Sequence, residues 1–148
     1  RYIREMGESK NNEIYLEPDV WLTQDSNLPI KNAKLHIINS ATPPEALLVL
    51  EAEGGIAISG DILQNTPEPD QYVNSLARIM IKKMGFWKAY NVGPAWLLNA
   101  NPKATEVRGI LDIPFNHVLP GHGSPVIGDA REKYRSVLEG TLKGSQTK

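Results

Sequence analysis

Two apolar runs separated by a glycine turn constrain the fold more than any other stretch of this sequence. They are residues 46–50 (ALLVL) and 55–59 (GIAIS), and Glu53-Gly54-Gly55 stands between them. Glycines adopt the positive φ angles that a tight hairpin turn requires at no steric cost. We therefore predict an antiparallel hairpin whose second strand runs directly into Gly60-Asp61.

Further strands are expected on both sides of this hairpin. Residues 34–38 (KLHII) and residues 117–119 (HVL) each predict one strand. Residues 13–23 predict one or two more, broken at 17–19. Residues 28–30 predict a short edge segment, because Pro29 lacks the N–H that a central strand would use.

Helical periodicity follows the hairpin. Apolar residues recur at spacings of three and four from residue 72 to residue 84, and Gly85 ends this helix. Residues 86–98 are aromatic and mixed, and Gly93-Pro94 interrupts them. A shorter helix is expected after Pro102, and a closing helix begins at the capping residue Asp129.

This order of elements predicts the fold class. Strands come first, and helices then surround a late strand, which is typical of an α/β or α+β domain with a mixed sheet. A chain of 148 residues fits one domain. Residues 1–12 are polar and are expected to be loosely held, whereas residues 13–148 are expected to form a single domain.

Composition excludes several functional classes. Apolar residues make up 41% and charged residues 22%, as in ordinary globular proteins. No apolar run is long enough to span a bilayer, and a net charge of −1 provides no electrostatic footprint for nucleic acid. No signal-peptide pattern is present, so we expect a cytoplasmic protein. Cysteine is absent, which leaves only histidine, aspartate and glutamate as metal ligands.

Two short motifs could carry chemistry. Asp61 stands at the end of a predicted buried strand, and His122 leaves a strand on a loop between Gly121 and Gly123. Glycine flanks permit the close backbone approach and unusual φ angles that ligand loops use. Each motif also has a plain structural interpretation, in which the aspartate caps a turn and the histidine is solvated. We expect the carboxylate and the imidazole to converge at one rim of the sheet.

In this order, residues 59–63 (SGDIL) and 118–123 (VLPGHG) resemble the second half of the metallo-β-lactamase superfamily. The resemblance covers roughly residues 34–142. It implies half of an αββα sandwich, with a mixed sheet and helices on one face. It also implies that Asp61 is a carboxylate bridging metal ions and that His122 is the last histidine ligand. The metal would be zinc or another divalent ion, whose bound hydroxide attacks an ester, amide, thioester or phosphodiester.

The sequence departs from this family in its ligand set. The family's His-x-His-x-Asp-His motif is absent. The family's Pro-Gly-His-Thr-Pro-Gly loop corresponds to residues 40–45 (SATPPE), where Ala41 occupies the histidine position. A catalytic zinc commonly takes three protein ligands, and Asp61 and His122 supply two.

The remaining candidates have structural interpretations. His36 shares a strand face with Lys34 and is expected to be solvated, and His117 is expected to hydrogen-bond a neighbour. Ser59 and Ser124 invite comparison with a hydrolase triad, but no Gly-x-Ser-x-Gly elbow supports one. No geometric argument favours two acids in predicted loops, Asp25 and Glu45. Four aromatic residues are expected in the core or an interface rather than a pocket: Phe86, Trp87, Tyr90 and Trp96.

Three functional hypotheses follow. The first is a half-domain without a complete metal site or assured catalytic activity. Its apolar sheet face, near residues 35–38 and 47–50, would be covered by a second copy in a homodimer. The second is a fragment or subunit of a metal-dependent hydrolase whose missing ligands lie elsewhere. The third is a non-catalytic partner-binding module anchored by Trp21, Trp87 and Trp96. The sequence selects no substrate.

Overall fold

The protein is an α+β fold with one mixed four-stranded sheet, as the sequence predicts, in a computed structural model that describes residues 19–68, 73–83 and 85–140. The main sheet contains β1 (Ala33–Ile38), β2 (Glu45–Leu50), β3 (Ile56–Ser59) and β6 (His117–Pro120). Two short strands, β4 (Leu63–Gln64) and β5 (Asn91–Val92), form a second sheet. The helices are α2 (Ser75–Lys83), α3 (Pro94–Ala100), α4 (Ala104–Gly109) and α5 (Ala130–Gly140), with a 3₁₀ turn, η1 (Ile110–Asp112), after α4.

The predicted hairpin is the centre of the main sheet. The strand order is β1-β2-β3-β6, with β1, β2 and β3 antiparallel and β6 parallel to β3. In the hairpin turn, Glu53, Gly54 and Gly55 all have positive φ angles, of 51°, 79° and 101°. A Cβ atom on Gly55 would lie 2.3 Å from the carbonyl oxygen of Pro114, so no larger residue fits there. The predicted strands at 34–38 and 117–119 are also confirmed.

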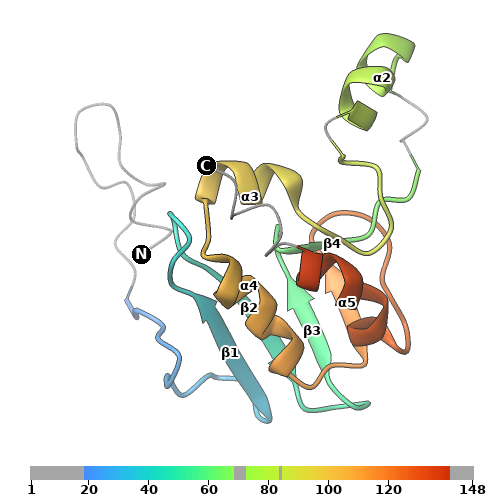
Figure 1. Cartoon of the computed structure of the whole chain (residues 1–148). Coiled ribbons are helices and arrows are strands. Elements are labelled where there is room, and N and C mark those ends of the chain that lie inside the picture. Colours follow the sequence, from blue (N-terminus) through green and yellow to red (C-terminus); the bar gives the residue numbers. More distant parts are fainter. Residues whose placement is uncertain (1–18, 69–72, 84, 141–148) are drawn as a thin grey trace, which may run out of the picture.

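One face of the sheet carries the core. Side chains alternate between the two faces of a strand, and the members that point toward the helices are buried. Figure 1 shows α4 and α5 on this side of the sheet and α3 at its upper end. The buried sheet residues on this face include Leu47, Val49, Ala57, Ser59 and Val118.

Helix α5 closes the core from above the sheet. Tyr134 and Leu138 on this helix are fully buried, as the periodicity of the closing helix predicts. The Tyr134 hydroxyl donates a hydrogen bond of 3.0 Å to the carbonyl oxygen of Gln64 in β4. This bond ties the last helix to the small second sheet and satisfies the polar end of a buried aromatic residue.

The opposite face of the sheet is apolar and is not covered by the described helices (Figure 1). By register it presents Leu35, Ile37, Leu48, Leu50, Ile56, Ile58 and Leu119. None of these side chains is fully buried, and the cross-strand neighbours Ile58 and Leu119 are 37% and 38% exposed. We call these seven residues the open sheet face.

The strands predicted before β1 are wrong where the structure describes them. Val20, Trp21 and Leu22 lie in an irregular segment and are 69%, 43% and 50% exposed. Residues 28–30 form no strand, and a bend occupies 29–30. The outer edge of β1 instead receives a side chain, because the backbone N–H of Ile37 donates to Gln24 Oε1 at 3.0 Å. Residues 13–18 lie outside the described residues.

The helical predictions are confirmed with two differences. Helix α2 spans Ser75–Lys83, and the expected ends at residues 72 and 84 lie outside the described residues. Figure 1 shows α2 standing apart from the sheet, so its periodicity does not mark a core contact. Ile79 and Met80 are 56% and 58% exposed on it.

Helix α3 is the second difference, because Pro94 begins a helix rather than interrupting one. Proline suits the first helical position, where its missing N–H would have no partner in any case. The shorter helix after Pro102 is α4, and the helix expected from Asp129 is α5.

Two predictions concern segments beyond the described residues. The loosely held segment 1–12 lies outside the described residues, so it and the single domain over 13–148 stay predictions. Within the described ranges, no helix has both the length and the apolar character needed to cross a bilayer.

The core assignment predicts a large loss of stability for Leu47→Ala. Leu47 is 0% exposed, and its truncation should lower the free energy of unfolding by about 2–5 kcal/mol because it leaves a cavity. The matched control is Leu98→Ala, since Leu98 is 78% exposed and its loss should change stability by less than about 0.5 kcal/mol. Urea denaturation measures both variants, and equal effects would contradict the assignment.

Candidate metal site

The parallel pairing of β3 with β6 brings the two sequence motifs to one rim of the sheet. Ser59 pairs with Pro120 at the ends of the two strands. Asp61 and His122 each follow two residues later, on loops that leave the same edge. The carboxyl ends of parallel strands are the usual location of ligand sites in α/β sheets.

Close backbone contact holds the two loops together. The Gly121 N–H donates to the carbonyl oxygens of Ser59 and Gly60, at 2.6 Å and 3.2 Å. A Cβ atom on Gly121 would lie 2.9 Å from the Gly60 oxygen, so glycine permits this approach. Close backbone packing therefore explains why the residue before His122 is a glycine.

Close backbone packing also explains the glycine after His122. Gly123 has a φ angle of +94°, and a Cβ atom there would lie 1.9 Å from the carbonyl oxygen of Asn65. The N–H of Asn65 donates to the carbonyl oxygen of His122 at 3.1 Å, and its side-chain amide donates to that of Ser124 at 2.9 Å. These contacts fix the histidine loop against the chain that follows β4.

Asp61 and His122 are in direct contact. Nε2 of His122 lies 2.9 Å from Oδ1 of Asp61. The Asp61 side chain is 53% exposed and the His122 side chain is 62% exposed, so both can be reached from solvent. Exposed pairs of this kind contribute little to stability, typically about 0–1 kcal/mol. The sequence expectation that the carboxylate and the imidazole converge is confirmed, whereas their role as metal ligands stays a prediction.

Glu45 is a second acid at this rim, beside Asp61, and the sequence alone did not indicate it. Its Oε1 accepts a hydrogen bond of 2.8 Å from the backbone N–H of Asp61. Partial burial raises the pKa of Glu45, and the nearby Asp61 carboxylate raises it further, against the lowering effect of that hydrogen bond. A Cβ atom on Gly60 would lie 2.5 Å from Glu45 Oε1, so a glycine before Asp61 makes room for this contact.

The residues at the rim fit a metal ion only in part. Histidine nitrogen and carboxylate oxygen are both ordinary zinc donors. Among the described residues, however, no group of three His, Asp or Glu side chains is arranged to hold one ion. Ala41, at the position where the resemblance would place a histidine, is a buried core residue that is 2% exposed.

The other two histidines lie elsewhere. His36 was expected to be solvated, but it is half-buried on the helix-covered face, where burial and then the positive charge of Lys34 lower its pKa. His117 hydrogen-bonds neighbours, as predicted. Its Nε2 lies 3.1 Å from the carbonyl oxygen of Glu53, and its Nδ1 accepts the N–H of Gly128 at 3.2 Å.

The serines do not form a triad with the pair. Ser59 is 1% exposed, and its hydroxyl accepts a hydrogen bond of 2.7 Å from the backbone N–H of Leu63, so the hydroxyl is engaged in a turn. Ser124 lies beyond the histidine and is exposed, where its backbone carbonyl accepts the bond from Asn65. Asp25 is likewise an exposed turn residue.

Two small pockets flank the Asp61–His122 pair. One, of about 220 Å³, is lined by both members of the pair and by apolar residues that include Ile81, Phe86 and Trp87. The other, of about 160 Å³, has Asp61, Glu45 and Trp96 in its lining. An apolar wall therefore stands directly beside two polar groups that can bind a ligand.

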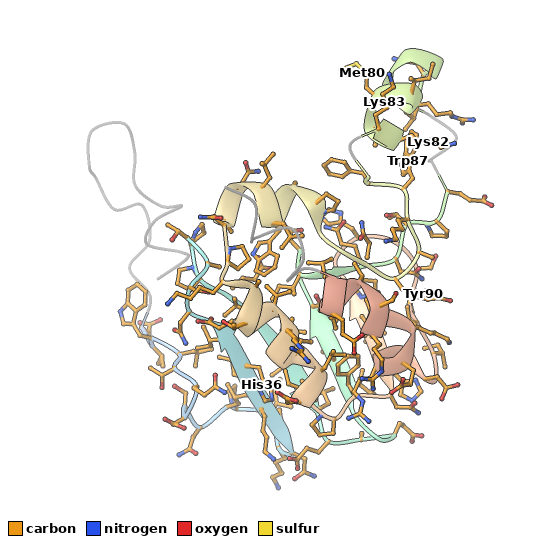
Figure 2. The ribbon with its side chains drawn as sticks, in the orientation of Figure 1. His36, Met80, Lys82, Lys83, Trp87 and Tyr90 are labelled. Atoms are coloured by element: carbon orange, nitrogen blue, oxygen red, sulfur yellow. The ribbon has the colours of Figure 1, made fainter. Side chains whose placement is uncertain are left out.

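The four aromatic residues have different environments. Trp96 is 6% exposed and belongs to the core, so it cannot be an exposed interface anchor. Tyr90 packs edge-to-face on Tyr134, with ring centroids 5.8 Å apart. Phe86 and Trp87 line the 220 Å³ pocket, contrary to the expectation of core or interface. Figure 2 places Trp87 near the base of α2.

Comparison with known proteins identifies no relative. No family model matches the chain, and neither the curated proteins nor the solved structures contain a significant match. The site is therefore interpreted from its own geometry.

The raised pKa of Glu45 predicts a specific pH dependence of stability. A carboxyl group whose pKa is raised in the folded state stabilises the fold below its unfolded pKa, and this contribution is lost as pH rises through the folded pKa. Glu45→Gln keeps a side-chain oxygen for the Asp61 N–H but cannot ionise. Its stability relative to the wild type should therefore increase as pH rises from below 4.5.

Glu132→Gln is the control of opposite sign. The hydrogen bond from Arg135 lowers the pKa of Glu132, so this contribution to stability is present above the unfolded pKa and lost as pH falls through the folded one. The stability of the wild type relative to Glu132→Gln should therefore increase as pH rises. Denaturation curves at several pH values measure both slopes, and slopes of equal sign would show that Glu45 is not perturbed as described.

Proposed function

We propose that this chain is one half of a metal-dependent hydrolase, in which Asp61 and His122 supply two ligands of a divalent ion. The observation that carries the proposal is their contact of 2.9 Å at the carboxyl ends of two parallel strands, with both side chains accessible. The donor set, one imidazole nitrogen and one carboxylate without sulfur, favours zinc or a similar divalent metal. The resemblance to the metallo-β-lactamase superfamily supports the same assignment for the same two residues.

The proposed site is incomplete within the described residues. A catalytic zinc commonly uses three protein ligands and keeps one position open for water. When bound, such an ion lowers the pKa of water to near neutrality and polarises the bond to be cleaved. The chain alone, with two ligands, is therefore expected to bind metal weakly and not to hydrolyse substrates.

The aromatic pocket supports an organic substrate with an apolar group. Phe86 and Trp87 stand beside the pair, and the Gln64 side chain adds a polar group to the same lining. An apolar substituent in this pocket would place a neighbouring polar bond near Asp61 and His122. Ester, amide, thioester and phosphodiester substrates all fit this description.

The open sheet face supports association with a second sheet. A contiguous apolar surface of this kind is costly in water and marks a contact surface. We propose that in the isolated chain a second copy covers it, to give a symmetric homodimer that rebuilds a sandwich of two sheets between helices. In a longer or two-chain hydrolase, the half that supplies the missing ligands would cover the same face.

A cytoplasmic location stays a prediction.

The proposal predicts that zinc binding depends on Asp61 and His122 together. Isothermal titration of the wild type should reveal one weak zinc site, which Asp61→Asn and His122→Gln each weaken at least about tenfold. Zinc should also raise the thermal stability of the wild type and not that of the variants, because a ligand of the folded state stabilises it.

His36→Gln is the matched control for these variants. It removes a half-buried imidazole from another part of the sheet, so the zinc site should be retained. Zinc binding that survives in the Asp61→Asn/His122→Gln double variant, or that is lost in His36→Gln alone, would disprove the assignment. A coding sequence upstream of Arg1 with a His-x-His-x-Asp-His motif would identify the missing ligands, and the joined chain should then hydrolyse a generic ester.

The homodimer is tested through the open sheet face. Sedimentation should show a dimer for the wild type and a monomer for Ile58→Lys/Leu119→Lys, since these two side chains are exposed cross-strand neighbours on this face. Leu98→Lys places the same charge on a side chain that is 78% exposed elsewhere and should leave the dimer intact. A monomeric wild type at micromolar concentrations would contradict the proposed homodimer. Circular dichroism checks that each variant remains folded.

A further inference from the structure

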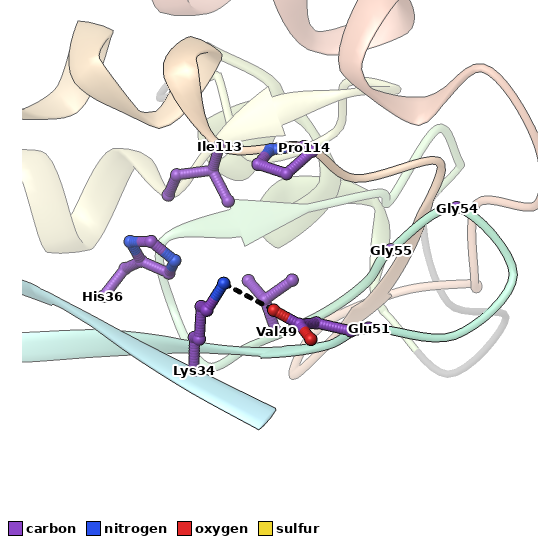
Figure 3. A pocket seen from close by; sticks show the side chains of 8 residues that line it. All are labelled: Lys34, His36, Val49, Glu51, Gly54, Gly55, Ile113 and Pro114. Carbon is purple, nitrogen blue, oxygen red and sulfur yellow. Dashed lines mark ion pairs between the residues drawn. The ribbon is translucent and has the colours of Figure 1, made fainter. Parts of the chain in front are cut away.

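A larger pocket lies at the other end of the main sheet from the Asp61–His122 pair. Its volume is about 460 Å³, within the range of small-molecule sites. The lining combines residues of β1 and β2 with the hairpin turn and with the loop after η1 (Figure 3). The turn precedes β3 and Asp61 follows it, so the two sites are separated by the length of this strand.

The wall formed by the hairpin turn is held firmly. The carbonyl oxygen of Gly55 accepts hydrogen bonds from the N–H groups of Asn116 and His117, at 2.8 Å and 3.0 Å. The approach of Gly55 to the Pro114 carbonyl leaves no room for a side chain. The pocket is therefore built into the fold and does not depend on a loop closing over it.

The inner part of the pocket is apolar. Val49 and Ile113 are 4% and 7% exposed, and Pro114 stands beside Ile113 in Figure 3. Burial of an aliphatic or aromatic group against such a surface is favourable by about 25 cal/mol per Å². An apolar ligand body would fill this part.

The mouth of the pocket carries one positive and one negative group. Lys34 Nζ forms an ion pair with the Glu51 carboxylate, drawn as a dashed line in Figure 3. Their side chains are 68% and 47% exposed, so the pair is weak and can open for a ligand. Opening the pair for a simple anion would leave Glu51 facing a like charge.

His36 adds a neutral polar group to the same lining. Burial and the charge of Lys34 lower its pKa, so the imidazole is neutral near neutral pH. Among the described residues it has no hydrogen-bond partner, in contrast to His117. One ring nitrogen can then donate a hydrogen bond to a ligand and the other can accept one.

We propose that this pocket binds a free amino acid with a large apolar side chain. The ligand carboxylate replaces Glu51 as the partner of Lys34, and the ligand ammonium group replaces Lys34 as the partner of Glu51. The apolar side chain lies against Val49, Ile113 and Pro114. A zwitterion matches a pocket of zero net charge, whereas a singly charged ligand leaves one member of the pair without a partner. The proposal is independent of the proposed hydrolase site.

Nuclear magnetic resonance titration of the full chain with L-phenylalanine tests the proposal. Saturable shifts are expected at Val49, Gly55 and Ile113, and none at Asp61 or His122. Two probes that each lack one charge, 3-phenylpropanoate and phenethylamine, should bind at least about tenfold more weakly, since each loses one charge-assisted hydrogen bond.

Two variants separate the zwitterion from a simple anion. Lys34→Gln and Glu51→Gln should each weaken phenylalanine binding at least about tenfold. Glu51→Gln should at the same time strengthen binding of 3-phenylpropanoate, because it frees Lys34. Glu132→Gln, which breaks another exposed ion pair, with Arg135 on α5, is the control and should change neither affinity.

Absence of saturable shifts at millimolar phenylalanine, shifts centred on His122, or equal affinity for phenylalanine and 3-phenylpropanoate would each overturn the proposal. Loss of zinc binding would leave it unaffected, since the two sites share no residue.

Discussion

The parallel pairing of β6 with β3 is the interaction on which the rest of the structure depends. It joins the last strand to the hairpin across the segment that contains α2, α3 and α4, and it aligns Ser59 with Pro120. Parallel partners cannot be joined by a tight turn, so the segment between β3 and β6 forms a crossover. Within it α4 covers one face of the sheet, whereas α2 stands apart (Figure 1). The same register sets Gly121 against Gly60. A slip by one residue would reverse the faces of β6 and separate the two loops.

Local patterns were sufficient to predict the elements with strong periodicity. The glycine turn at residues 53–55 and the strand into Gly60-Asp61 depend on backbone preferences that act within a few residues. Helix α5 was equally clear, since its buried face repeats at helical spacing. The strand predicted at residues 20–22 was wrong because β propensity largely reflects packing against neighbouring strands, and these residues have no partner strand in the structure.

The environments of single side chains could not be predicted in the same way. Glu45 reaches the Asp61 N–H only because β1, β2 and β3 lie in one register and Gly60 carries no side chain. His36 shares a face with Lys34, as expected, but which face the helices cover is a property of the whole fold. The proximity of Asp61 and His122 was predictable because a resemblance of two motifs supplied long-range information that periodicity does not contain.

Both edges of the main sheet already have hydrogen-bond partners, whereas its open face has no covering element among the described helices. This difference limits how the molecule can associate. At β6, Val118 exchanges both backbone hydrogen bonds with Val126, each of 2.9 Å, so that edge is already occupied. At β1, the amide oxygen of Gln24 takes the N–H of Ile37. Unpaired edges invite strand addition and fibril growth, and side-chain plugs are one means of blocking them. Lateral extension of the sheet is thus disfavoured at both sides, and stacking of one sheet upon another is the mode of assembly that this architecture leaves open.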